Sequence, residues 1–116
     1  MVDRSLPEPV PSDVLVMLCT APSLAVAETL ARSAIDARLA ACVNLIDGVR
    51  SIYRWEGEVC NEPEVQLLFK TTRERAKALR ELIAREHPYE VPELLALPVD
   101  PTLSGESYLR FVRDSV

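Results

Sequence analysis

The sequence RSIYRWEGEVCNEPEVQLLFKTT, residues 50–72, decides the fold of this chain. The apolar residues of its second half share odd positions: Val59, Val65, Leu67 and Phe69. This period of two is typical of a strand with one buried face. In the first half, Tyr53 and Trp55 alternate with arginines, and Glu56-Gly57 separates the halves. The stretch therefore predicts a long β-hairpin that reverses at Glu56-Gly57.

Three residues interrupt the alternation of the hairpin. Ile52 and Leu68 are aliphatic residues at otherwise polar positions. Pro63 has no amide hydrogen for a strand ladder, so it indicates a bulge or a sheet edge. Tyr53 and Trp55 flank the polar face with large rings, which favours contact with another subunit.

The residues before the hairpin predict the first half of a βαβ unit. Residues 14–19 form a continuous apolar run that is typical of a central strand. Ser23 can cap an amphipathic helix over residues 23–37. Residues 39–46 predict a second strand, and Asp47-Gly48 then predicts a bulge because the alternation resumes at once.

The residues after the hairpin predict two helices with a strand between them. Thr71 and Glu74 have the spacing of a capping box, and the helix that they open should end at His87, before a proline. Residues 91–99 predict the last strand. Ser104 should cap a C-terminal helix whose inward residues are Tyr108, Leu109 and Val112.

The order of these elements is that of an α+β, ferredoxin-like fold, β-α-β-β-α-β with an added helix. Residues 14–116 would form this domain, and the proline-rich residues 1–13 a flexible tail. Both long helices should cover one sheet face and leave the other open. Residues 39–55 would span roughly 55 Å at about 3.3 Å per residue, so the hairpin should protrude. We therefore expect a closed oligomer with its sheets packed inward.

Composition excludes several classes of function. The net charge of -5 argues against binding to nucleic acid, which depends on clustered Lys and Arg. No apolar run approaches the ~18 residues of a membrane-spanning helix, so no membrane partner is expected. The chain has three cysteines, an odd number without a disulfide-like spacing, which favours the reducing cytoplasm.

Several motifs resemble those of the CutA family, the divalent-cation tolerance proteins. They are LAACVNLI, SIYRWEGEV, EVQLLFKT, HPYEVPELLALPV and YLRFV, and they cover roughly residues 14–112 in the family's order. The resemblance implies a ferredoxin-like trimer, similar in architecture to PII-type signalling proteins, in which long hairpins clasp adjacent subunits. It also implies a role in tolerance of copper and other divalent metals, with copper as a candidate ligand.

Four residues could ligate such a metal by their chemistry: Cys19, Cys42, Cys60 and His87. Because the first two strands should run parallel, Cys19 and Cys42 are expected near opposite ends of the sheet. Both cysteines can equally be buried apolar residues. Cys60, on the polar side of the hairpin, is the thiol expected to meet solvent.

A second candidate site is a cleft between subunits. His87 can cap its helix or make a turn contact, or it can lie at this cleft. The cleft candidates are Tyr53, Trp55, Glu64, Lys70 and Tyr89. A small anion or a metal ion could bind there, although Glu64 and Lys70 can also be solvated or paired, and the rings can anchor subunits.

The sequence predicts a protein without catalytic activity. It contains no recognisable nucleophile and base at the spacing of a hydrolase, and no glycine-rich phosphate loop. Three functions remain open: a trimeric protein of divalent-metal tolerance, a small-molecule sensor that uses clefts between subunits, and a structural or adaptor trimer without a ligand.

Overall fold

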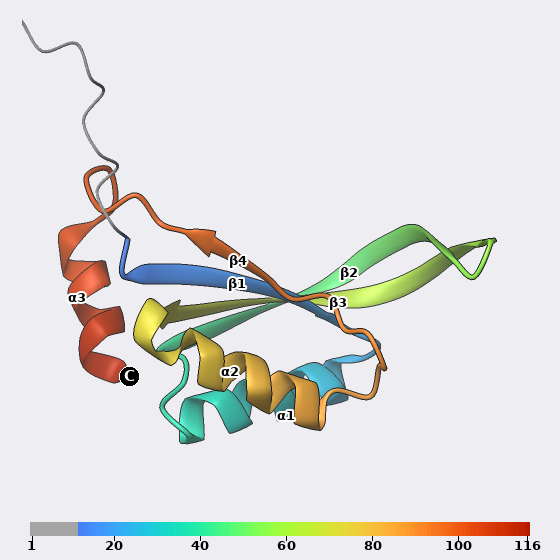
Figure 1. The fold of residues 1–116 in the computed structure, drawn as a ribbon, viewed down its shortest axis with the longest axis horizontal. Helices are drawn as coiled ribbons and strands as arrows, with labels where there is room; N and C mark the ends of the chain where they lie inside the picture. Colours follow the sequence, from blue (N-terminus) through green and yellow to red (C-terminus); the bar gives the residue numbers. More distant parts are fainter. Residues whose placement is uncertain (1–11) are drawn as a thin grey trace, which may run out of the picture.

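The computed structural model describes residues 12–116 as a four-stranded antiparallel sheet with two long helices on one face (Figure 1). The elements are β1 (Val14–Ala21), α1 (Leu24–Asp36), β2 (Cys42–Trp55), β3 (Glu58–Thr72), α2 (Arg73–Glu86), β4 (Leu95–Pro98) and α3 (Glu106–Ser115). The strand order is β2-β3-β1-β4. This order confirms the predicted ferredoxin-like, α+β arrangement.

The β2–β3 hairpin extends well beyond the rest of the sheet (Figure 1). β1 ends at Ala21, opposite Val65, whereas the β2–β3 pairing continues to Trp55 opposite Glu58. Glu56 and Gly57 both have positive φ, 50° and 82°, as a two-residue type I′ turn requires. The radius of gyration is 16.7 Å, above the about 13 Å of a compact chain of this length, because the hairpin protrudes.

Two predicted irregularities of the hairpin are present. The register shifts between Ile46 and Val49, and Gly48 there has φ 78°, so the predicted bulge at Asp47-Gly48 is confirmed. Pro63 pairs with Arg50 on β2, and β1 has already ended on its other side. Pro63 therefore lies where β3 is a sheet edge, which needs no amide donor.

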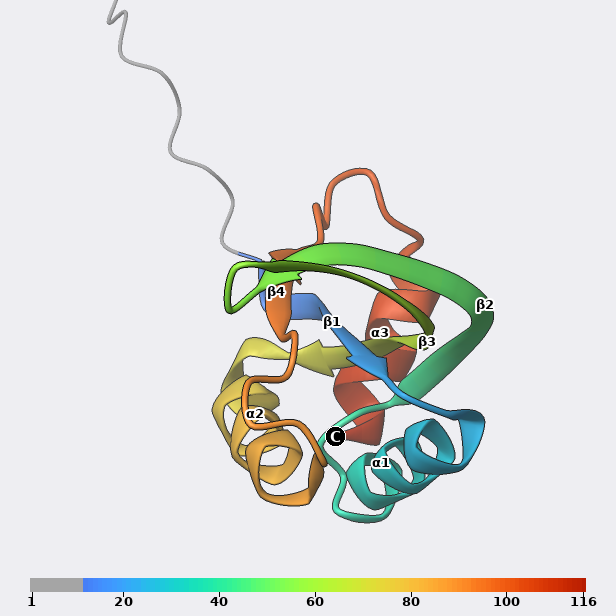
Figure 2. The same ribbon diagram turned by 90° about the vertical axis from the view of Figure 1, so that its right-hand side faces the viewer.

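The main core lies between the sheet and the helices α1 and α2, which run side by side below it (Figure 2). Ser23 caps α1, since its Oγ accepts a hydrogen bond of 3.2 Å from the amide of Val26. The largest core side chains are fully buried: Phe69, Leu67, Leu30, Leu79 and Ile83. Each such side chain contributes roughly 1.5–3 kcal/mol to folding.

Several predicted boundaries were wrong because tertiary contacts override local signals. Thr71 does not open a capping box: it pairs with Leu15 in the sheet, and its hydroxyl donates to the Leu39 carbonyl at 2.7 Å. α2 therefore begins at Arg73, after the N-cap residue Thr72. β2 starts at Cys42 and not at residue 39. Leu39 is buried before the strand begins, and its carbonyl accepts the hydrogen bond from Thr71.

The last strand and the last helix also differ from the prediction. β4 covers only Leu95–Pro98 and not residues 91–99. Its pairing with β1 begins at Leu95, opposite Leu18, because the residues before it, including Pro92, line the cavity described below. The N-cap residue of α3 is Gly105, and the Ser104 hydroxyl donates instead to the Asp100 carbonyl at 2.6 Å.

α3 packs against the end of the sheet where β1 begins. Leu109 and Val112 are buried there with Val14 in a second, smaller cluster, as predicted. Tyr108 was predicted to face inward, but its side chain is 47% exposed and lies beside Phe111, with ring centroids 5.6 Å apart.

Most of the predicted tail, residues 1–11, lies outside the described residues. The next two residues contact the domain. Ser12 is buried, and its hydroxyl lies within hydrogen-bond distance of the carbonyls of Val14 and Val99, which share its single hydrogen. Asp13 accepts hydrogen bonds of 2.7 and 2.9 Å from Arg113 on α3.

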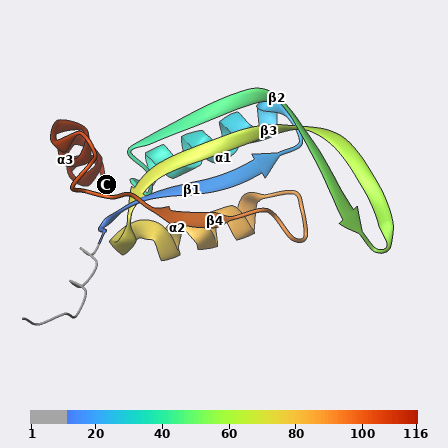
Figure 3. The ribbon, with the colours of Figure 1, turned by 90° about the horizontal axis from the view of Figure 1, so that it is seen from above.

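Figure 3 shows the sheet face opposite α1 and α2, on which β3, β1 and β4 lie side by side. The pairing of these strands places two rows of apolar residues on that face. One row is Leu95, Leu18 and Leu68, and its neighbour is Leu97 and Val16. Leu95 and Leu97 remain 54% and 46% exposed. We call these five residues the open-face rows. They also explain Leu68, which interrupts the polar alternation of β3.

Among residues 12–116, no helix is long and apolar enough to cross a membrane.

Candidate ligand-binding cleft

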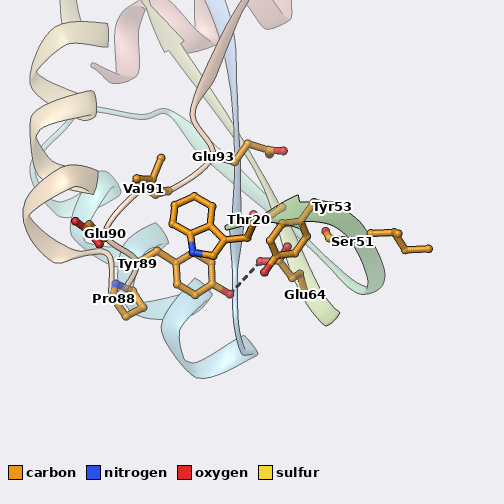
Figure 4. A pocket seen from close by; sticks show the side chains of 12 residues that line it. Thr20, Ser51, Tyr53, Glu64, Pro88, Tyr89, Glu90, Val91 and Glu93 are labelled. Carbon is orange, nitrogen blue, oxygen red and sulfur yellow. Dashed lines mark hydrogen bonds between the residues drawn. The ribbon is translucent and has the colours of Figure 1, made fainter. Parts of the chain in front are cut away.

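A cavity of ≈ 780 Å³ lies between the hairpin and the segment that follows α2 (Figure 4). Its lining residues come from β1, β2, β3 and residues 88–93: Thr20, Ser51, Ile52, Tyr53, Trp55, Glu64, Pro88, Tyr89, Glu90, Val91, Pro92 and Glu93. The twisted hairpin supplies one wall, and the proline-bounded segment, which does not form a strand, supplies the other. We call this cavity the cleft.

Glu64 and Tyr89 join the two walls of the cleft. The Tyr89 hydroxyl donates a hydrogen bond of 3.0 Å to Oε2 of Glu64, which the dashed line in Figure 4 marks. Glu64 is only 8% exposed although it carries a carboxylate. Burial raises the pKa of Tyr89 to about 12, and the hydrogen bond and the charge of Glu64 act in the same direction.

His87 holds the segment against β1. Its Nδ1 accepts a hydrogen bond of 3.0 Å from the amide of Tyr89, so Nε2 carries the hydrogen and donates to the Thr20 carbonyl at 2.7 Å. The His87 and Tyr89 rings lie 4.8 Å apart. His87 thus makes a turn contact next to the cleft, and both of its ring nitrogens are engaged within the chain.

Four of the five predicted cleft residues line the cleft: Tyr53, Trp55, Glu64 and Tyr89. Lys70 does not. It lies on the same strand as Glu64 but six residues away, roughly 20 Å at about 3.3 Å per residue. Its Nζ donates instead to Asn44 Oδ1 and to Cys42 Sγ, the latter at 3.8 Å.

The cysteines lie in three different environments. Cys19 is fully buried in the main core, and this burial raises the pKa of its thiol to about 12, with smaller contributions from the charges of Glu93 and Glu64. Cys42 is half-buried beside Lys70. Cys60 is half-buried on the hairpin, where it pairs with Tyr53.

The prediction that Cys19 and Cys42 lie near opposite ends of the sheet was wrong. The two side chains are nevertheless separated from each other, because they lie on opposite faces of the sheet. They pair with Leu67 and Lys70 of β3, only three residues apart, and not at opposite ends of the sheet. Successive strand residues face opposite sides, so Cys19 faces the helices and Cys42 the other face. Within residues 12–116, no three His, Cys, Asp or Glu side chains are grouped so that they could hold a metal ion.

Sequence reasoning missed the contribution of Thr20, Ser51, Glu90 and Glu93 to the cleft. The predicted strand of residues 91–99 included Pro92 and Glu93, so these two residues were not considered as part of a wall. The pair of prolines, Pro88 and Pro92, on either side of Tyr89 was the available signal, because such spacing disfavours regular structure.

Comparison with known proteins places the chain in a family. A family model described as CutA1 divalent ion tolerance protein matches residues 15–115. The chain belongs to this family. A divalent-cation tolerance protein CutA of Pectobacterium atrosepticum is 46% identical over 117 residues, which cover 100% of this chain and 99% of that protein. The resemblance drawn from the sequence motifs is therefore confirmed.

Solved structures share the fold. The divalent cation tolerance protein Cut A1 of Thermus thermophilus has a TM-score of 0.84 at 44% identity, covering 89% of this chain and 98% of that one. A PII-like protein CutA of Nostoc sp. PCC 7120, in apo form, has a TM-score of 0.81 at 38% identity, covering 87% and 95%. A periplasmic divalent cation tolerance protein CutA of Archaeoglobus fulgidus has a TM-score of 0.83 at 28% identity. The match covers 88% of this chain and 97% of that one.

Proposed function

We propose that this chain is a non-catalytic homotrimer that supports tolerance of divalent cations, with copper as the metal. The family to which it belongs is named for this tolerance. The observation that carries the proposal is the pair of open-face rows, since Leu95 and Leu97 leave a sheet face apolar and half exposed in a single chain. Such a face favours association. The number of three subunits follows from the family resemblance.

The absence of catalysis is supported by the state of the two strongest candidate groups. His87 uses both ring nitrogens in hydrogen bonds to the backbone. Cys19 is fully buried, and burial raises the pKa of its thiol to about 12, so it is not a thiolate near neutral pH.

The two half-buried thiols, Cys42 and Cys60, are the candidate copper ligands. Cys42 and Cys60 are the cysteines that a metal ion can reach, and thiolates are preferred ligands of copper. One chain offers no cluster of three ligands among its described residues. We therefore propose that copper is held by these thiols from more than one subunit.

Copper titration of the purified, tag-free protein tests this proposal. Cys60→Ser and Cys42→Ser should lower the amount of copper bound per trimer, whereas Cys19→Ala should leave it unchanged because Cys19 is buried. Calorimetry with light scattering on the same samples separates loss of metal from loss of assembly. A trimer that ignores copper would contradict the metal role.

A second function, that of a small-molecule sensor, is favoured by the cleft. A cavity of ≈ 780 Å³ lined by three aromatic rings is of the size that small ligands occupy. A thermal-shift screen with nucleotides, small anions and small cations tests this function, because a ligand that binds only the folded protein raises its Tm. No shift with any of them would favour an adaptor trimer without a ligand.

We propose the cytoplasm as the site of action. The described chain has three free cysteines and no disulfide, as is usual in a reducing compartment. The Archaeoglobus fulgidus relative, in contrast, is described as a periplasmic protein. Fractionation of cells that produce the untagged chain would test the location.

A further inference from the structure

The charge of the cleft is one-sided. Three of its lining residues are carboxylates, Glu64, Glu90 and Glu93, and none is Lys, Arg or His. The two ion pairs within the described residues are Arg110–Glu106 and Arg113–Asp13, neither of which involves the cleft. Among residues 12–116, none of the three carboxylates has a Lys, Arg or His nitrogen within 4 Å.

Glu64 is the most constrained of these carboxylates. It is 8% exposed, and within residues 12–116 its carboxylate accepts one hydrogen bond, from the neutral Tyr89 hydroxyl. A carboxylate that loses most of its water is stabilised when a positive charge replaces that water. The raised pKa values of Tyr89 and Cys19, caused first by burial and then by Glu64 or Glu93, are consistent with a negative potential around the cleft.

Aromatic rings complete the walls. Tyr53, Trp55 and Tyr89 line the cleft, and Figure 4 shows Tyr53 and Tyr89 on either side of the Glu64 carboxylate. Aromatic faces attract organic cations through the ring quadrupole, and a nearby carboxylate adds to this attraction. A metal ion needs several N, O or S ligands, and the described residues provide no group of three.

We infer that the cleft binds a small organic cation, an ammonium or guanidinium group carried on an apolar body. Glu64 and Glu93 supply the opposite charge, while Trp55 and the two tyrosines contact the apolar body and the face of the cation. The inference rests on the proposed sensor function and names its ligand class. This charge is opposite to that of the small anion considered from the sequence.

The single tryptophan of the chain is a built-in reporter. Trp55 lines the cleft, and the sequence contains no other tryptophan, so at a fixed protein concentration, with the state of assembly unchanged, a change in its fluorescence reports this site. The probe is benzyltrimethylammonium, titrated into the assembled protein at constant ionic strength. Its neutral and anionic comparisons are benzyl alcohol and benzoate. We expect saturable binding of the cation at least about tenfold tighter than of benzyl alcohol, and no saturation with benzoate.

A matched pair of variants assigns the charge. Glu64→Gln keeps an acceptor for the Tyr89 hydroxyl and removes the charge, so it should weaken binding of benzyltrimethylammonium about tenfold. Glu81→Gln removes the same charge from the exposed surface of α2 and should change affinity less than about twofold. Equal losses in both variants would overturn the role of Glu64. If Glu64→Gln does not fold, the three probes on the unmodified protein still decide the sign of the charge.

The outcomes separate this inference from the functions on which it rests. Saturable binding of benzoate in place of the cation would overturn the inference and leave the sensor function standing. Binding of none of the three probes, together with no shift in the wider ligand screen, would remove both. Copper binding and the mass of the assembly are measured separately, so neither result depends on the cleft.

Discussion

The hydroxyl of Tyr89 and Oε2 of Glu64 lie 3.0 Å apart in a hydrogen bond that connects the segment after α2 to the hairpin strand β3. Their separation of 25 residues makes this bond a tertiary contact. It fixes one wall of the cleft against the other and gives a nearly buried carboxylate its donor. Several consequences of the structure can be tested through this pair.

Removal of the Tyr89 hydroxyl should destabilise the fold. Tyr89→Phe leaves Glu64 without its donor, and we expect the free energy of unfolding to fall by about 1–3 kcal/mol. Tyr108→Phe is the control, since Tyr108 is 47% exposed and its loss should cost less than about 0.5 kcal/mol. Urea denaturation measures both. Equal effects in the two variants would show that the Tyr89–Glu64 bond contributes nothing to stability.

The same pair predicts a dependence on alkaline pH. The folded protein raises the pKa of Tyr89 to about 12, above the ordinary value of about 10, so the folded state favours the neutral phenol. Its contribution to stability is complete below pH 10 and is lost as the pH rises from about 10 to about 12. The stability difference between the unmodified chain and Tyr89→Phe should therefore shrink between pH 8 and pH 11. A difference that stays constant in urea titrations would contradict the shifted pKa.

The thiols of Cys19 and Cys60 should differ in reactivity. Cys19 is fully buried, and its pKa is raised to about 12, so it should resist iodoacetamide in the native protein at pH 8. Cys60, half-buried on the hairpin, should be alkylated more than about tenfold faster than Cys19. Peptide mass spectrometry after timed alkylation measures each site. Modification of Cys19 at the rate of Cys60 would mean that the core opens readily.

The sequence predicted most of the fold because its signals are local. The alternation of residues 50–72 and the Glu56-Gly57 turn define the hairpin, and Ser23 defines the start of α1. Thr71 and Ser104 were wrongly predicted as helix caps. The Thr71 hydroxyl donates to the carbonyl of Leu39, which is distant in sequence, and the Ser104 hydroxyl donates to the carbonyl of Asp100. A residue type at the right spacing could not reveal which partner the fold would supply.

The candidate site was predicted less completely. Tyr53, Trp55, Glu64 and Tyr89 were assigned to a cleft, and the structure brings these four together within one chain. Lys70 was grouped with Glu64, although the two residues are six positions apart on the strand. The path of residues 88–93 depends on the contacts of His87 with Thr20 and Tyr89, which no periodicity of the sequence reveals.

The open-face rows predict the effect of a buried charge on assembly. Leu95→Asp places a carboxylate among the apolar residues of the proposed subunit interface, so it should convert the proposed trimer to monomers at micromolar concentration. Leu103→Asp is the control, because Leu103 is 87% exposed in the loop before α3. Trp55→Ala should weaken assembly on dilution more than it lowers the stability of the core. Sedimentation velocity measures the assembly of all three variants, and urea denaturation measures the stability of Trp55→Ala. An unchanged mass for Leu95→Asp would exclude this face as the interface.

The most direct test of the trimer is the mass of the tag-free protein by light scattering across a dilution series. The chain has a mass of 12.9 kDa. The proposal predicts a particle of three chains, about 39 kDa, that persists to low micromolar concentration. A particle with the mass of one chain at every concentration would contradict the proposed assembly and leave the apolar face of the sheet without a partner.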